Sequence, residues 1–120
     1  MDEVLINILE NIEIPDGVSY KAYRQGSIPE EMEYPDTFFT FWNNNTVEHS
    51  AYDNNTTIEQ YDFDVYVYST DIDLCINLLS KARKMLKDNG WIIDTISFDA
   101  YSDEITHVGK GMRVLFLKQV

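Results

Sequence analysis

The sequence predicts an α+β domain whose largely antiparallel or mixed five-stranded sheet carries two helices on one face. Three observations lead to this fold class. The chain has 120 residues, which suits a single domain covering 1–120. Two segments have apolar residues at helical spacing, and five others are short runs rich in aromatic and β-branched residues. These segments follow the order α-β-β-β-α-β-β, in which hairpin-linked strands favour antiparallel pairing.

The first helix is expected at about residues 2–12. Its first turn is acidic, which the helix dipole favours, and its apolar side chains recur at helical spacing; they are Leu5, Ile8, Leu9 and Ile12. A weakly alternating segment at about 18–25 is the expected first strand. An irregular stretch with two prolines and four acids then leads to the second strand.

The second strand is expected at about 37–43, because this stretch is dense in aromatic residues. Alternation places Phe39 and Phe41 on one face of the strand. The other face carries Phe38, Thr40 and Trp42. Residues 43–57 have Asn clusters at both ends and are expected to form a long loop or arm.

The third strand, at about 57–69, alternates clearly between an apolar and a polar side. The apolar side is formed by Tyr61, Phe63, Val65 and Val67, and the other side by Asp62, Asp64, Tyr66 and Tyr68. The apolar side is expected to pack under the helix that follows. The third strand is therefore expected to be the central strand of the sheet.

The second helix is predicted at about 71–88, with Thr70 as its N-cap and Asn89-Gly90 as its C-cap. Its apolar stripe consists of Ile72, Cys75, Ile76, Leu79, Ala82 and Leu86. Two more strands are expected, at about 91–101 and 112–119. Gly109-Lys110-Gly111 is interpreted as the turn before the last strand.

Charge is distributed unevenly along the chain. The formal net charge is −12, and residues 1–64 hold 14 acids but only Lys21 and Arg24, whereas residues 65–120 hold seven acids and seven bases. Nucleic-acid binding needs the opposite sign, because phosphate contacts require Lys and Arg. Three interpretations of the acidic half stay open: it keeps the protein soluble, it repels DNA, or it binds a basic partner. No signal peptide or membrane span is expected, because the N-terminus starts with acids and no apolar run approaches about 20 residues.

Asp62 and Asp64 are the residues that most resemble a chemical site. Two apart on one strand face, they are spaced like a hydrolytic or metal-binding carboxylate pair. Such a pair needs a pocket that shifts a pKa, whereas these aspartates continue the polar side of a regular alternation, which is expected to be a solvent-exposed sheet face. Tyr66 and Tyr68 follow on the same side, and exposed tyrosine is common at protein interfaces. The favoured interpretation is an interaction surface.

The remaining residue patterns indicate no cofactor, metal or catalytic nucleophile. His49 and His107 stand isolated in polar segments, and the chain lacks H-x-x-x-H, C-x-x-C and G-x-S-x-G. The single cysteine, Cys75, lies among apolar residues and is expected to be a buried thiol.

The element order and several segments resemble the tail-terminator, or tail-completion, proteins of long-tailed bacteriophages and prophages. The segments are "SIPEEMEYPDTFFTFW", "YDFDVYVYSTDIDLCINLLSKARKMLKDNGW" and "MRVLFLKQ". The resemblance runs from about residue 2 to 118 and lies in pattern and element order. It implies a non-enzymatic virion tail protein without metal or cofactor, assembled in the bacterial cytoplasm.

The resemblance also implies partners. Members of the family form a ring, usually a hexamer, between the tail-tube protein and the head connector, and DNA passes through the lumen without specific binding. The interface residues are not carried over from the family; strand alternation and residue type indicate Asp62, Asp64, Tyr66, Tyr68 and Trp42. Three alternatives stay open: a neighbouring head–tail joining component, an acidic DNA-mimic inhibitor of a basic protein, and a small hydrolase using Asp62 and Asp64.

Overall fold

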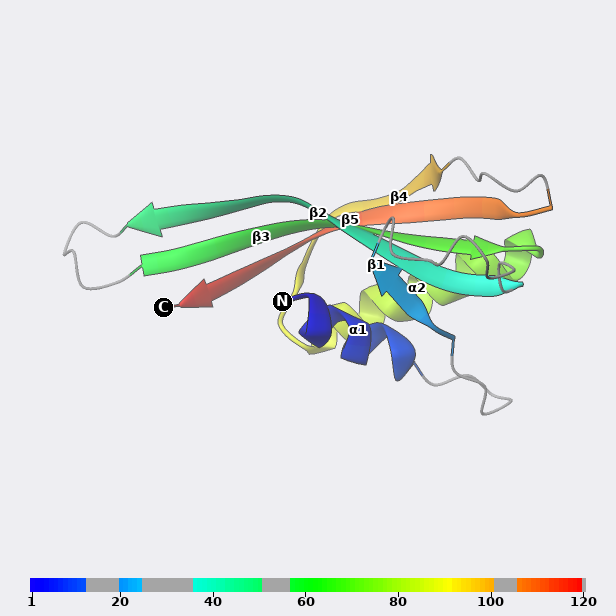
Figure 1. Ribbon diagram of the computed structural model, residues 1–120, viewed down its shortest axis with the longest axis horizontal. Coiled ribbons are helices and arrows are strands. Elements are labelled where there is room, and N and C mark those ends of the chain that lie inside the picture. Colours follow the sequence, from blue (N-terminus) through cyan, green and yellow to red (C-terminus); the bar gives the residue numbers. More distant parts are fainter. Residues whose placement is uncertain (13–19, 25–35, 51–56, 101–105, 120) are drawn as a thin grey trace.

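The computed structural model describes residues 1–12, 20–24, 36–50, 57–100 and 106–119. Within these residues two helices and five strands follow one another (Figure 1): α1 (Asp2–Glu10), β1 (Ala22–Arg24), β2 (Thr37–Ser50), β3 (Thr57–Ser69), α2 (Ile72–Asp88), β4 (Ile92–Ala100) and β5 (Val108–Gln119). The strands form one mixed sheet in the order β1-β2-β3-β5-β4. β1 pairs with β2 in parallel, and the β2–β3, β3–β5 and β5–β4 pairs are antiparallel. The predicted α+β class and element order are confirmed.

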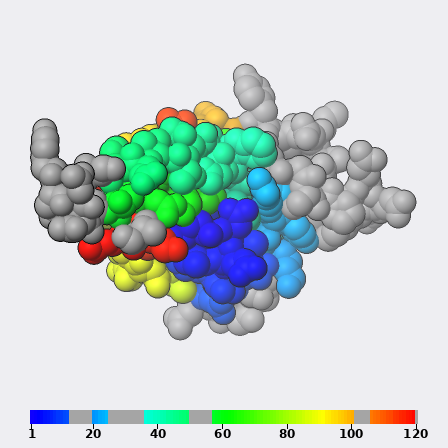
Figure 2. Space-filling model, turned by 60° about the vertical axis from the view of Figure 1, so that its left-hand side comes forward, coloured from blue at the N-terminus to red at the C-terminus, as the bar shows by residue number. Residues whose placement is uncertain are grey.

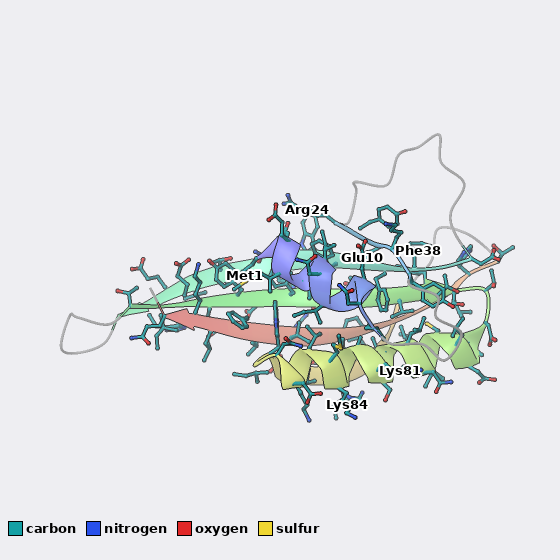
Figure 3. All side chains as sticks on the ribbon, turned by 90° about the horizontal axis from the view of Figure 1, so that it is seen from below. Met1, Glu10, Arg24, Phe38, Lys81 and Lys84 are labelled. Atoms are coloured by element: carbon teal, nitrogen blue, oxygen red, sulfur yellow. The ribbon has the colours of Figure 1, made fainter. Side chains whose placement is uncertain are left out.

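Both helices lie on the same face of the sheet. Figure 3 looks onto this face and shows α1 over β2 and β3, with α2 over the β5 and β4 side. Their apolar stripes meet the odd-numbered side chains of β2 and β3, as the alternation predicted. The core includes Leu5, Leu9, Phe39, Phe41, Phe63, Val65, Val67, Leu78, Leu86, Met112 and Val114. Neither helix of the described chain is long and apolar enough to span a membrane.

α2 begins at Ile72, one residue later than predicted. Asp71 is the N-cap, and its carboxylate accepts a hydrogen bond of 3.0 Å from the Asp73 amide; Thr70 lies before it and is exposed. At the other end Gly90 has φ +88°, which suits a residue without a side chain. Within the helix, Ile72 and Ile76 of the expected apolar stripe are 41% and 50% exposed.

Cys75 lies on the buried side of α2, as expected. Its thiol donates to the carbonyl of Val67 over 3.1 Å, and burial raises the pKa of the thiol. This cysteine is therefore held in its protonated form as part of the core.

α1 secures the β1 edge of the sheet. The Glu10 carboxylate accepts a hydrogen bond of 3.2 Å from the Ala22 amide, and Arg24 lies 3.8 Å from Asp2. In Figure 2 the blue surface of α1 lies between the green of the central strands and the light blue of β1. The helix ends at Glu10, and the first strand covers only residues 22–24 of the expected 18–25, of which residues 18, 19 and 25 lie outside the described part.

The prediction of a loop at 43–57 is wrong for residues 43–50. β2 continues to Ser50, because Asn45–Ser50 pair in register with Thr57–Asp62 of β3. A register shift between Asn43 and Asn45 lets the strand continue past the aromatic stretch. Residues 51–56 lie outside the described residues.

β4 and β5 also differ from their predicted bounds. β4 ends at Ala100, and residue 101 is not described. β5 starts at Val108, so the predicted glycine turn is part of a strand.

Three strands extend beyond the helices. We call this extension the arm; it consists of residues 43–50 of β2, 57–62 of β3 and 115–119 of β5. Figures 1 and 3 show that no helix covers it. The described chain measures 53 × 31 × 22 Å along its principal axes, and the arm accounts for the elongated shape.

Candidate functional site

The sheet face opposite the helices carries a continuous row of aromatic rings. Neighbouring ring centroids are 6.3 Å apart for Tyr23–Phe38, 5.5 Å for Phe38–Tyr68, 6.2 Å for Tyr68–Tyr66 and 5.9 Å for Tyr66–Phe98. The row therefore runs from β1 to β4, across the full width of the sheet. Edge-to-face and offset contacts at these distances stabilise aromatic clusters. The aromatic side chains of the helix-free face therefore pack against one another.

Two glycines let this row cross β5. In the sheet register Gly109 lies beside Tyr68, and Gly111 lies between Tyr66 and Phe98. A Cβ at Gly111 would come within 2.6 Å of the Phe98 ring, and one at Gly109 within 2.7 Å of the Tyr68 ring. The prediction of a turn at Gly109-Lys110-Gly111 is therefore wrong. These glycines are needed because aromatic rings cover the β5 backbone.

Asp64 is buried on this same face, with an exposed fraction of 7%. Nε of Arg113 donates to one carboxylate oxygen over 3.0 Å, and the Tyr66 hydroxyl donates to the other over 3.2 Å. The hydrogen bond to Asp64 raises the pKa of Arg113 above its usual value. Burial, followed by the charge of Asp64, raises the pKa of Tyr66 to about 12. The expectation that Asp64 lies on a solvated face is therefore wrong, because Arg113 and Tyr66 surround it.

Asp62 is separated from this network. It is half-buried where the arm begins, and it accepts a hydrogen bond of 3.1 Å from the Gln60 amide. Gln60 is in turn 3.1 Å from Nε2 of His49. The two aspartates therefore have different partners and do not form one carboxylate pair. Within the described ranges no group of three or more His, Cys, Asp or Glu is arranged to hold a metal ion.

Trp42 is an exposed member of the site. It pairs with Asp64 in the β2–β3 register, and 45% of its surface is accessible. The structure thus places all five predicted interface residues on one face. Asp64, Tyr66, Tyr68 and Trp42 form a connected patch, whereas Asp62 belongs to the arm.

Several members of this patch could not be predicted from the sequence. Phe98 and Arg113 reach it only through the register of β4 and β5. His107, assigned to a polar loop, lies with its ring centroid 5.9 Å from that of Phe38. The aromatic content of β2 and β3 signalled the patch, but no local pattern marks the residues that β4 and β5 add.

The arm presents a second polar region, on the same side of the sheet as the helices. Glu48 lies directly opposite Glu59 in the β2–β3 register, and Lys118 lies on the other side of Glu59. The Tyr61 hydroxyl donates to Glu59 over 2.8 Å, and this hydrogen bond raises the pKa of Tyr61. A hollow of about 410 Å³ is lined by Thr46, Val47, Glu48, Thr57 and Glu59. The arm therefore has an acidic depression near its β2 edge.

Comparison with known proteins gives no family assignment: no protein-family model and no curated protein matches the chain.

Proposed function

We propose that the protein is a non-enzymatic structural component of a long-tailed phage or prophage. In this proposal six copies form a ring that caps the tail tube and joins it to the head. It assembles in the bacterial cytoplasm and becomes part of the virion tail. The proposal rests on the resemblance of the sequence to tail terminators and on the chemistry of the helix-free face.

The observation that carries the proposal is the aromatic patch around Trp42. Tyrosine, tryptophan and arginine dominate the binding energy of protein interfaces, and Tyr66, Tyr68, Trp42 and Arg113 lie together here. Asp64, the buried carboxylate in the patch, is engaged by Arg113 and Tyr66. A carboxylate held in this way supports recognition of a fixed surface better than it supports proton transfer.

In this function two different surfaces are needed, one toward the tail-tube protein and one toward the head connector. The helix-free face and the helix-covered face differ in composition, and a ring uses heterologous contacts between copies. The acidic excess of the chain, −12 overall, suits a lumen through which DNA passes without binding. The same properties fit a neighbouring head–tail joining component.

An acidic DNA mimic is the second candidate, because the net charge of −12 arises entirely from residues 1–64. A mimic would bind a basic enzyme through carboxylates spaced like phosphates. The Asp64–Arg113 pair removes one carboxylate from that surface. This candidate predicts strong binding to a basic protein and no effect on tail tubes.

Tube assembly tests the proposed function. Tail-tube protein from the same genome is polymerised with substoichiometric amounts of this protein, and tube lengths are measured by electron microscopy. Shorter tubes with gold-labelled protein at one end are the expected result. Tubes of unchanged length with label at neither end would overturn the proposal.

A matched pair of variants locates the contact. Trp42→Ser and Val4→Ser both remove an exposed apolar side chain, each 45% accessible, the first on the aromatic patch and the second on α1. Trp42→Ser should abolish capping, and Val4→Ser should leave it intact, with circular dichroism confirming that both variants fold. Equal capping by both would exclude the aromatic patch as the tube contact.

A further inference from the structure

The arm continues the sheet but lacks the helix layer that covers the rest of that face. Outside the arm, in what we call the body, α1 and α2 cover the side chains of β2, β3 and β5. Figure 3 shows no helix over the same face of the arm, which we call the bare face. Tyr61 and Phe116 mark the boundary, since both are only partly buried against the core. The arm therefore consists of the sheet layer alone, without the helix layer that packs on the rest of the sheet.

The bare face of the arm carries Glu48 and Glu59, and Lys118 lies opposite Glu59 in the β3–β5 register without an ion pair to it among the described residues. Glu48 and Glu59 are directly opposite each other, an arrangement that destabilises a strand pair when both groups are charged. Glu59 accepts a hydrogen bond from Tyr61. Among the ion pairs between described residues, which involve Asp2, Asp64 and Asp99, neither glutamate takes part. Both border the hollow on the arm.

α2 has the complementary charge on its outward side. Lys81, Arg83, Lys84 and Lys87 fall within its C-terminal half, and Lys84 and Lys87 are exposed. Arg83 donates to the Ile96 carbonyl over 3.4 Å. Figure 3 shows Lys81 and Lys84 on α2, over the body of the molecule and not over the arm. The exposed Ile76 lies on the same helix.

The two surfaces also match in length. The β2 portion of the arm, residues 43–50, spans about 26 Å at about 3.3 Å per residue. α2 has 17 residues, and at about 1.5 Å per residue it is also about 26 Å long. One helix can therefore cover the arm from its base to its tip.

We infer that the occupant of the arm is α2 of a second copy of this chain. The outward side of that helix lies on the helix-side face of the arm, and Lys81 and Lys84 reach Glu48 and Glu59. The contact is heterologous, so each copy offers its arm to one neighbour and its α2 to the other, which allows a ring to close. This inference rests on the proposed function in that it supplies the subunit contact of the proposed ring.

The contact should be weak in the free protein and sensitive to salt. A face of three short strands buries far less than the roughly 1,600 Å² of a standard interface, and exposed ion pairs are screened by salt. Chemical cross-linking is therefore the right measurement, because it captures an association that is populated only briefly.

The experiment pairs cysteines between copies in a Cys75→Ala background. A Glu48→Cys variant is mixed with a Lys84→Cys variant of different tag length, and disulfide formation is followed under mild oxidation. The control mixture combines Glu48→Cys with Glu3→Cys, which places an exposed cysteine on α1. The expected rate for the first mixture is about tenfold above the control, the gain that about 1.4 kcal/mol of association gives. Equal rates in the two mixtures would overturn the inference.

Charge reversal provides an independent readout by sedimentation velocity at low salt. Glu48→Lys/Glu59→Lys and Lys81→Glu/Lys84→Glu should each reduce self-association, because like charges then meet across the contact. When the two variants are mixed, opposite charges meet in both possible contacts between unlike copies, so a heterodimer should be restored. If the mixture associates no better than either variant alone, the assignment of these charges is wrong.

The outcomes separate this inference from the proposed function. Tubes capped normally by a protein whose cross-linking stays at the control rate would leave the function standing and remove the contact. Rapid cross-linking by a protein that leaves tubes unchanged would show self-association through the arm in a protein that is not a terminator.

Discussion

Arg113 binds the buried carboxylate of Asp64 across the β3–β5 pair, with Nε 3.0 Å from Oδ1. The two residues are 49 positions apart, yet the register places them side by side on the helix-free face. The Asp64 side chain is 10% exposed, whereas the Arg113 side chain is 48% exposed. The pair therefore has a buried anion and a more exposed cation. Removing the cation and removing the anion should change the free energy of unfolding by different amounts.

Replacing Arg113 by Leu should lower the free energy of unfolding by about 1–2 kcal/mol, because a buried polar group loses its main partner. Urea unfolding at pH 7 measures this cost. Arg24→Leu is the matched control, since Arg24 is 62% exposed and 3.8 Å from its aspartate, and such pairs contribute about 0–1 kcal/mol. A smaller cost for Arg113→Leu than for Arg24→Leu would contradict the role given to Asp64.

The period of two in β3 was sufficient to predict which side chains face the helices. Phe63, Val65 and Val67 are fully buried, and Tyr66 and Tyr68 lie on the opposite face. Alternation could not predict that Asp64 is buried, because Arg113 approaches it from another strand. The same limit applies to Gly109 and Gly111, which look like turn residues until Tyr68 and Phe98 are placed over them.

The arm was missed for a different reason. Asparagine is uncommon in strands, so Asn43, Asn44 and Asn45 indicated a loop. Pairing with β3 outweighs that preference, and the register shift at Asn43/Asn45 accommodates the extra residue. The acidic pair Glu48 and Glu59 becomes visible only once this pairing is known.

Stability should decline between about pH 10 and pH 12 because of Tyr66. Its pKa is raised to about 12 in the folded protein, and an unfolded tyrosine titrates near 10. A group whose pKa rises on folding stabilises the fold fully below its unfolded pKa, and this contribution is lost as the pH increases through the folded value. Unfolding free energies measured across this range should show the loss, and Tyr66→Phe should reduce the slope. An identical slope in Tyr66→Phe would show that the Tyr66 hydroxyl is not responsible.

Gly111→Ala should destabilise the protein by about 1–3 kcal/mol, the usual cost of overpacking. The new methyl group would lie 2.6 Å from the Phe98 ring. Phe98→Ala removes that ring, so the double variant should lose less stability than the sum of the two single variants. Thermal unfolding of the four proteins in this double-mutant cycle measures the coupling. Strict additivity would mean that the ring does not lie over Gly111.

Thr40 and Thr37 provide the closest comparison of two identical side chains in one strand. Both lie on β2 and are buried, at 5% and 7% exposure. The Thr40 hydroxyl has no hydrogen-bond partner among the described residues, whereas that of Thr37 is 2.9 Å from the Ser69 hydroxyl. Thr40→Val removes an unsatisfied polar atom without changing the shape of the side chain, so it should stabilise the protein by about 1 kcal/mol.

Thr37→Val should have the opposite sign, because it leaves the fully buried hydroxyl of Ser69 without that partner. The expected loss is about 1–2 kcal/mol. Urea unfolding of both variants under the same conditions gives the comparison, with valine favourable in a strand at either position. Stabilisation by both substitutions would show that strand propensity alone decides the outcome. Destabilisation by Thr40→Val would show that its hydroxyl makes a hydrogen bond in solution.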